Sequence, residues 1–251
     1  MSPKTILFLG ATGGCGLSAL RRSLAAGHTC IALCRTPSRL TAKLPAGVDT
    51  SKLRIEQGNA HSAADLVRVL AHPTDPIALV DAVLFAIGGA YSFSTFSIDD
   101  PHVCENGMAT LVAALKQVRA ETGRAGSPTI VAISTTGVTR SGTRDVPLLM
   151  VPLYHGILKV PHKDKQAMEK ALVESGEERW TVVRASLLTD GSETEVCKSI
   201  RVGVEDPIAA KAESQAVGYT VSREDVGKWI FESILQGDGW KYAKKAVTVT
   251  Y

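Results

Sequence analysis

The chain has 251 residues, of which 45% are hydrophobic and 21% charged, so it is an ordinary globular protein rather than a chain of low-complexity linkers. Its net charge of +3, with Lys and Arg dispersed along the sequence, argues against nucleic acid as the main partner. The five cysteines are odd in number and lack paired metal-site spacing, so we expect reduced thiols and no bound metal.

The N-terminal stretch predicts a strand, a tight turn and a helix. Residues 6–9 are apolar, glycines follow at 10, 13 and 16, and helical spacing runs over 17–26. Gly10 allows the turn, Gly13 lets a phosphate approach the backbone, and Gly16 lets the helix pack on the strand. Unpaired amides at the helix N-terminus would then hold the pyrophosphate of a dinucleotide. The alternative is an ordinary strand-to-helix turn. The apolar run is too short for a secretory signal or a membrane span, so we expect a cytoplasmic protein with no membrane partner.

The second predicted strand, residues 29–34, bears on the choice of cofactor. An Asp or Glu just beyond this strand would accept from the ribose 2′-hydroxyl of NAD. The segment 35–39 contains no acid, and Arg35, Ser38 and Arg39 could hold a 2′-phosphate instead. The sequence therefore favours NADP(H), and solvated surface charges are the alternative.

The next two strands also end in polar or glycine residues. Residues 53–57 form a predicted strand, and Asn59 follows where a side chain could bind the adenine edge or serve as a turn residue or cap before the helix 63–70. Residues 80–87 form a nearly continuous apolar strand, typical of burial on both faces. Gly88 and Gly89 follow and would leave room for a cofactor.

The pattern then continues in alternation, which implies a parallel sheet with ligands at the carboxyl ends of its strands. A helix over 103–120 precedes a strand over 128–133, whose end delivers Ser134 to a cleft in which a nicotinamide would lie. A plain loop-entry cluster is the alternative there.

The C-terminal half is less regular. The Pro-interrupted stretch 147–152 predicts an apolar wall or flap rather than a helix. From residue 162 a helix is expected, with His162, Lys165 and Glu169 on one face. The alternative is that Lys165 and Glu169 form only a solvated ion pair. The remaining expectations are a strand at 180–184, a cleft-covering segment at 192–217, a helix at 222–235 that begins with a Ser and Asp cap, and a strand at 247–250. No linker interrupts this order, so residues 1–251 are expected to form one domain.

With these residues assembled, the chain resembles the atypical short-chain dehydrogenase/reductases of the NmrA-like and biliverdin-IXβ-reductase-like type. The residues that carry the resemblance are the glycine loop 10–16, Arg35, residues 58–60, Ser134, the segment 165–176, residues 183–184 and residues 222–226. The resemblance implies a Rossmann-type doubly wound α/β fold, a parallel sheet with helices on both faces and a small substrate-side segment near the C-terminus.

The resemblance also implies roles for residues in the second half of the chain. By register, Lys165 resembles the Lys that binds the nicotinamide ribose in active relatives, but Pro161 stands where the Tyr proton donor is usual. Ser134, His162, Tyr154, or substrate and water are the alternative proton sources. The residues expected to act in catalysis are Ser134, Lys165, His162 and Tyr154. The residues expected to bind the cofactor are Gly10, Thr12, Gly13, Gly14, Cys15, Gly16, Arg35, Ser38, Arg39, Asn59, Ala60, Ala86, Ile87, Gly88, Ser134, Lys165 and Leu187.

The function expected from these features is NADPH-dependent reduction of a flat conjugated carbonyl, quinone or flavin-like molecule. Such rings accept hydride at an electrophilic position and need little help from an acid. Two alternatives are a non-catalytic NADP(H)-sensing protein and a non-redox isomerase or lyase on the same scaffold. A small-molecule substrate and a monomeric or homodimeric state are expected.

Overall fold

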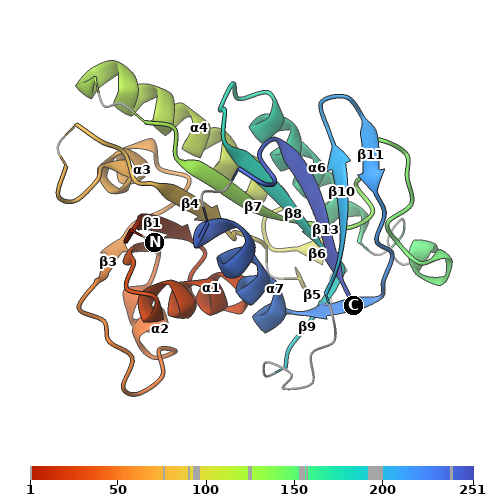
Figure 1. The fold of residues 1–251 in the computed structure, drawn as a ribbon, viewed down its shortest axis with the longest axis horizontal. Coiled ribbons are helices and arrows are strands. Elements are labelled where there is room, and N and C mark those ends of the chain that lie inside the picture. The colour runs from red at the N-terminus through yellow and green to blue at the C-terminus, as the bar shows by residue number, and fades with distance from the viewer. Residues whose placement is uncertain are drawn as a thin grey trace.

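The computed structural model (Figure 1) describes residues 2–75, 77–89, 91–92, 97–123, 126–152, 156, 158–191, 200–237 and 240–251. The elements in chain order are β1 (Thr5–Leu9), α1 (Gly14–Ala25), β2 (Thr29–Cys34), α2 (Pro37–Thr41), β3 (Leu53–Gln57), α3 (Ala63–Leu70), β4 (Ala82–Phe85), β5 (Tyr91–Ser92), β6 (Ser97–Ile98), α4 (Val103–Thr122), β7 (Thr129–Thr135), η1 (Leu148–Met150), α6 (Lys159–Val173), β8 (Trp180–Ala185), β9 (Leu187–Thr189), β10 (Arg201–Asp206), β11 (Lys211–Ser214), β12 (Thr220–Ser222), α7 (Arg223–Ile230), η2 (Phe231–Leu235) and β13 (Lys245–Thr250).

The central sheet is parallel from β3 to β13 and antiparallel beyond it. Its strand order is β11-β10-β13-β8-β7-β4-β1-β2-β3, and β10 and β11 run antiparallel to their neighbours. The chain winds from β1 outward to β3 and then from β4 outward in the other direction. The order therefore reverses between β1 and β4, and a ligand of a doubly wound fold binds in the crevice at such a reversal.

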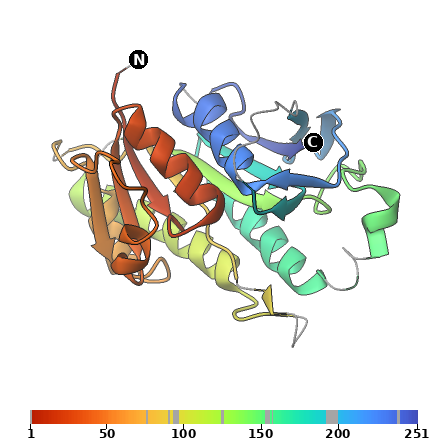
Figure 2. The same cartoon turned by 90° about the horizontal axis from the view of Figure 1, so that it is seen from below.

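Two layers of side chains bury the two faces of the sheet. In β1, Ile6 and Phe8 belong to one hydrophobic cluster, and Leu7 and Leu9 belong to the other, because successive strand residues point to opposite faces. Helices α1 and α7 cover the first face, where they pack against each other (Figure 2), and α3, α4 and α6 cover the second. This arrangement confirms the doubly wound α/β fold.

Serine side chains cap two helices, and only the cap of α7 was expected from the sequence. The side chain of Ser222 accepts a hydrogen bond from the backbone amide of Asp225 at the start of α7. Ser62 does the same for Asp65 at the start of α3. Ser62 rather than Asn59 is therefore the cap, and Asn59 Oδ1 instead accepts from the amide of His61, 3.1 Å away, in a turn.

One prediction for the second half of the chain is wrong in the described residues. Residues 148–150 form a 3-10 turn instead of a non-helical wall, and Leu148 and Leu149 are exposed, at 71% and 82%. Residues 201–206 and 211–214, for which the sequence showed no clear periodicity, are strands that extend the central sheet. Residues 192–199 lie outside the described part of the chain. The helix expected over 222–235 is α-helical to Ile230 and continues as a π-helical turn.

Within the described residues, no helix is both long and apolar enough to span a bilayer.

Candidate active site

Two adjoining cavities open at the carboxyl ends of the strands, where the strand order reverses. One has a volume of about 800 Å³ and runs from the ends of β1 and β2 to β4. The other, about 320 Å³, lies between the start of α1 and the ends of β7 and β8. Gly13, Ala86, Ile87 and Gly88 line both, so the two cavities form one continuous site. Their sizes are typical of small-molecule and cofactor sites.

The glycines of the loop after β1 have two different roles. Gly10 has φ +95°, and a Cβ there would lie 2.5 Å from the carbonyl oxygen of Ala86; a Cβ on Gly16 would lie 2.3 Å from the carbonyl oxygen of Gly10. These two positions therefore need glycine for the turn and for packing. A Cβ on Gly13 would meet only Lys43 Nζ, at 3.3 Å, and Gly13 lines both cavities. Its backbone is extended, with φ 173°, so the fold itself does not require glycine at this position.

The larger cavity carries the arginines expected to select the cofactor. Arg35, Thr36 and Arg39 line it beyond the end of β2, and neither arginine has an ion-pair partner among the described residues. Ser38 is exposed on α2 and does not line this cavity. Asn59 and Ala60 line it at the end of β3. Two carboxylates, those of Asp99 and Asp100, belong to the lining as well.

The smaller cavity contains a buried hydroxyl that has no partner. Ser134, at the end of β7, is 4% exposed, and no described residue forms a hydrogen bond with its Oγ. A buried polar atom without a partner is costly. This hydroxyl is therefore available to a ligand in the cavity, such as the carboxamide or ribose of a nicotinamide nucleotide.

Lys165 reaches the same cavity from α6. Its Nζ donates to the carbonyl oxygens of Ile87, 2.9 Å away, and Ile133, 2.8 Å away, at the ends of β4 and β7. An ammonium has three N–H donors, so one remains after these two bonds. The lysine thus joins the two strand ends and keeps a donor for a hydroxyl group.

Of the other residues considered as proton sources, His162 does not line this cavity. His162 is buried on α6, where its Nδ1 lies 2.5 Å from the carbonyl oxygen of Leu158 and its Nε2 lies 3.1 Å from that of Thr136. It lines neither cavity, and both ring nitrogens face backbone carbonyl oxygens. Pro161 does not line them either. Tyr154 lies outside the described residues.

Several lining residues were not identified from the sequence. Arg223, at the start of α7, lines the smaller cavity beside Gly14, together with the apolar side chains of Leu158 and Leu188. Residues so distant in sequence carry no local signal for a shared site. Cys15 also lines this cavity, but burial raises the pKa of its thiol to about 12, which makes it a poor nucleophile at neutral pH.

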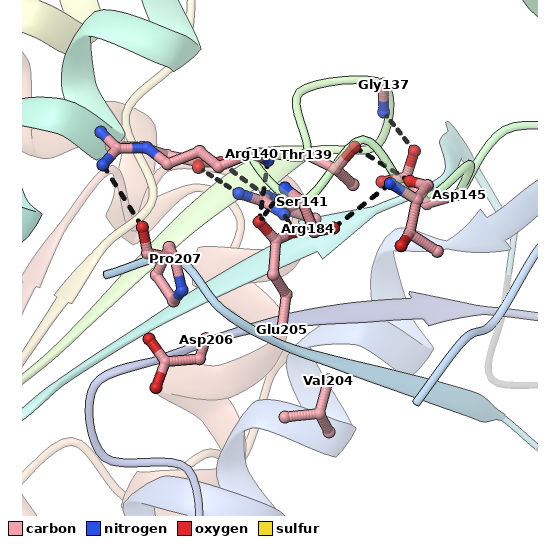
Figure 3. A network of polar contacts seen from close by, with 12 residues as sticks. Gly137, Thr139, Arg140, Ser141, Asp145, Arg184, Val204, Glu205, Asp206 and Pro207 are labelled. Carbon is pink, nitrogen blue, oxygen red and sulfur yellow. Dashed lines mark hydrogen bonds and ion pairs between the residues drawn. The ribbon is translucent and has the colours of Figure 1, made fainter. Parts of the chain in front are cut away.

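A buried charged cluster supports the site from the side of β8 (Figure 3). Arg184 is fully buried, and its Nε and one terminal nitrogen donate to Glu169 on α6, at 3.1 and 2.7 Å. Its other terminal nitrogen donates to Glu205 on β10. Glu205 also accepts the backbone amides of Arg140, 2.8 Å away, and Ser141, 3.0 Å away. The cluster therefore connects the helix that bears Lys165 to the loop that leaves β7.

A second carboxylate holds the same loop. Asp145 accepts the backbone amide of Gly137, 2.9 Å away, and its other oxygen is buried with no hydrogen-bond partner. Burial raises the pKa of this carboxyl above its usual value, although the amide of Gly137 and the charge of Arg184 oppose the shift.

Comparison with known families agrees with this geometry. A family model described as NAD(P)H-binding matches residues 10–236. Two fungal proteins are similar over the whole chain and 99% of their own lengths: the reductase pytE of Aspergillus terreus, at 39% identity, and the oxidase pynE of Aspergillus niger, at 35%.

Solved structures of similar fold include a short-chain dehydrogenase/reductase from Veillonella parvula in complex with NADP. It has a TM-score of 0.70 and 18% identity, and the match covers 100% of this chain and 95% of that one. ChuY, an anaerobillin reductase from Escherichia coli O157:H7, has a TM-score of 0.66 and 17% identity, with 99% and 97% coverage.

Proposed function

Because the chain belongs to the NAD(P)H-binding family of Rossmann-fold oxidoreductases, as its resemblance predicted, we propose that it is an NADPH-dependent reductase of a flat conjugated carbonyl, quinone or flavin-like molecule. Two finer points are part of this proposal: the preference for NADPH over NADH, and the class of substrate.

The observation that carries the cofactor preference is the pair of arginines beyond β2. Arg35 and Arg39 line the larger cavity without an ion-pair partner among the described residues, and no acidic residue stands in the segment 35–39. A 2′-phosphate would accept charge-assisted hydrogen bonds from such guanidinium groups. The ribose of NADH offers no such charge, so the arginines favour NADPH.

The residues of the smaller cavity fit the nicotinamide end of the cofactor, which supplies hydride chemistry when bound. Ser134 has an unpartnered hydroxyl to donate, and Lys165 has a donor for the ribose. Gly88 leaves open space, because a Cβ there would meet no atom within 4 Å. These groups orient the reacting ring, and orientation supplies a large part of the rate in such a site.

The substrate class rests on the lining of the smaller cavity. Ile133, Leu158, Leu187 and Leu188 give it apolar walls that suit a flat ring. Reduction of a quinone or flavin adds one hydride and leaves an anion, which takes its proton from solvent. The reaction therefore needs no strong acid, and none of the described lining residues of this cavity is a carboxylic acid, a histidine or a tyrosine.

Calorimetric titration with NADPH and NADH tests the cofactor preference. We expect NADPH to bind at least tenfold more tightly, and Arg35→Gln and Arg39→Gln each to weaken NADPH by about tenfold while leaving NADH unchanged. Arg54→Gln, on the exposed part of β3, is the matched control. Equal binding of the two cofactors by the native protein would overturn the preference.

Turnover is tested with a panel of quinones, flavins and enones, with NADPH oxidation as the readout. Sustained oxidation with at least one member supports the reductase. Because the two fungal relatives are named a reductase and an oxidase, the reverse direction is assayed with NADP⁺ and the reduced rings.

A non-catalytic NADP(H) sensor is the second candidate, and Pro161 favours it. This residue occupies the register position of the usual Tyr acid and lines neither cavity. A sensor binds NADPH without turnover, and its affinity for a partner differs between NADP⁺ and NADPH. Binding without turnover across the whole panel would favour it over the reductase.

A further inference from the structure

Arg223 is the one guanidinium among the described residues that lines the smaller cavity, and it lies directly over the glycine loop. A Cβ built on Gly14 would come within 3.2 Å of Arg223 Cδ and 3.8 Å of its Nε. The arginine is the first residue of α7, and α7 packs on α1, whose first turn the glycine loop forms (Figure 2). The fold therefore brings a cation from residue 223 to a loop at residues 13–14.

The guanidinium of Arg223 forms an ion pair with Asp190, and breaking this pair costs little free energy. Its terminal nitrogen donates to Asp190 Oδ1 at 2.7 Å, and the side chain of Asp190 is 93% exposed. Ion pairs with so exposed a carboxylate contribute little to stability. The pair is set by two short strands, because β12 ends at Ser222 and is paired with β9, which ends at Thr189.

A second cation approaches the same loop. Lys43 Nζ lies 3.3 Å from the position of a Cβ on Gly13, and it has no ion-pair partner among the described residues. The loop is also the N-terminal end of α1, where free amides and the helix dipole favour an anion. Independently, the buried Ser134 Oγ, which has no hydrogen-bond partner among the described residues, belongs to the cavity that Arg223 also lines. These features mark the space above Gly13 and Gly14 as a place for an anionic ligand.

We propose that Arg223 binds the pyrophosphate of the cofactor and that Asp190 competes with the cofactor for this guanidinium. The inference rests on the proposed function and deepens it. In the free protein Asp190 holds Arg223 over the loop; on binding, the pyrophosphate takes over the hydrogen bond and Asp190 returns to solvent. Asp190 thus lowers the affinity for the cofactor without contacting it.

Substitutions of Arg223 and of Asp190 should change the affinity for NADPH in opposite directions. Arg223→Gln weakens NADPH by about tenfold, the low end for a hydrogen bond to a charged group. Asp190→Asn strengthens NADPH binding about twofold to fivefold, because an exposed ion pair is the only competitor removed. The double variant binds like Arg223→Gln alone. Arg54→Gln is again the control, and the unfolding midpoint of each variant verifies that the fold is intact.

The ligands tested by calorimetry separate the possible sources of the anion. 2′-Phospho-ADP-ribose keeps the pyrophosphate and loses the nicotinamide, so Arg223→Gln weakens it as much as NADPH. 2′-AMP has no pyrophosphate, and its affinity is unchanged. If Arg223→Gln leaves both NADPH and 2′-phospho-ADP-ribose unchanged and raises only the KM of a carboxylated substrate, the anion is a substrate carboxylate and the proposal is overturned.

Failure of this inference is distinct from failure of the proposed function. A native protein that binds NADPH, with an Arg223→Gln variant that binds it equally well, overturns the role of Arg223 alone. A native protein that binds neither NADPH nor NADH overturns both.

Discussion

Replacing Arg184 by Met tests the view that the buried cluster holds the site together. The guanidinium is 1% exposed and its two partners, Glu169 and Glu205, are 3% and 7% exposed. After the substitution, Glu169 loses both hydrogen bonds that it accepts from Arg184, whereas Glu205 keeps the amides of Arg140 and Ser141. Removing one partner of a buried ion pair typically costs about 3–5 kcal/mol, because a buried charge is left without compensation.

The assay is urea unfolding at neutral pH, with the free energy of unfolding as the readout. Arg184→Met should lose about 3–5 kcal/mol. Adding Glu169→Leu to it should recover more than half of this loss, because a buried pair replaced by apolar residues is often nearly neutral. Arg54→Met removes an exposed pair with Glu56 and should lose at most about 1 kcal/mol. A loss below about 1 kcal/mol for Arg184→Met, or no recovery in the double variant, would refute the reasoning.

Three further predictions concern single positions. Ser134→Ala removes a buried hydroxyl without a partner, so thermal unfolding of the free protein should show no loss of stability and a gain of up to about 1 kcal/mol, while calorimetry shows weaker binding of NADPH. Gly13→Ala should keep the fold and lose cofactor binding. Gly10→Ala should lower the free energy of unfolding by about 1–3 kcal/mol or more, because φ at Gly10 is +95° and a Cβ there meets the carbonyl of Ala86. Equal stability of the two variants would contradict these separate roles. Burial raises the pKa of the Asp145 carboxyl, so the folded state holds the carboxyl proton more tightly than the unfolded state does. This contribution to stability is fully present below the usual carboxyl pKa of 3.8 and is lost as the pH rises through the pKa of the folded state. The Tm of Asp145→Asn relative to the native protein should therefore rise over that pH window, and a constant difference would argue that Asp145 is not perturbed.

Much of the fold is predictable from the sequence, because each half of the sheet is built from local signals. Apolar runs at 6–9 and 29–34, the glycine loop between them and the Ser222 cap all specify structure within a few residues of themselves. These local patterns also predict that the glycine loop and Arg35 lie at a ligand cavity. In the structure, Gly10, Gly13 and Arg35 line the same cavity. The cofactor roles of these residues stay predictions.

The tertiary structure decided what depends on residues far apart in the chain. Strand β10 escaped recognition because one of its faces carries Gly203 and Glu205, although Val202 and Val204 on the other face pack against the core. A Cβ at 203 would lie 2.6 Å from the amide nitrogen of Ala216, and the carboxylate at 205 pairs with Arg184. His162 shares a helix with Lys165, yet it is bound to backbone carbonyls, whereas Arg223 reaches the glycine loop from the other end of the chain. Local sequence determines which segments become strands and helices, because propensity and periodicity act over a few residues. Which polar side chains face the cavity depends on how distant segments pack, and only the folded chain brings those segments together.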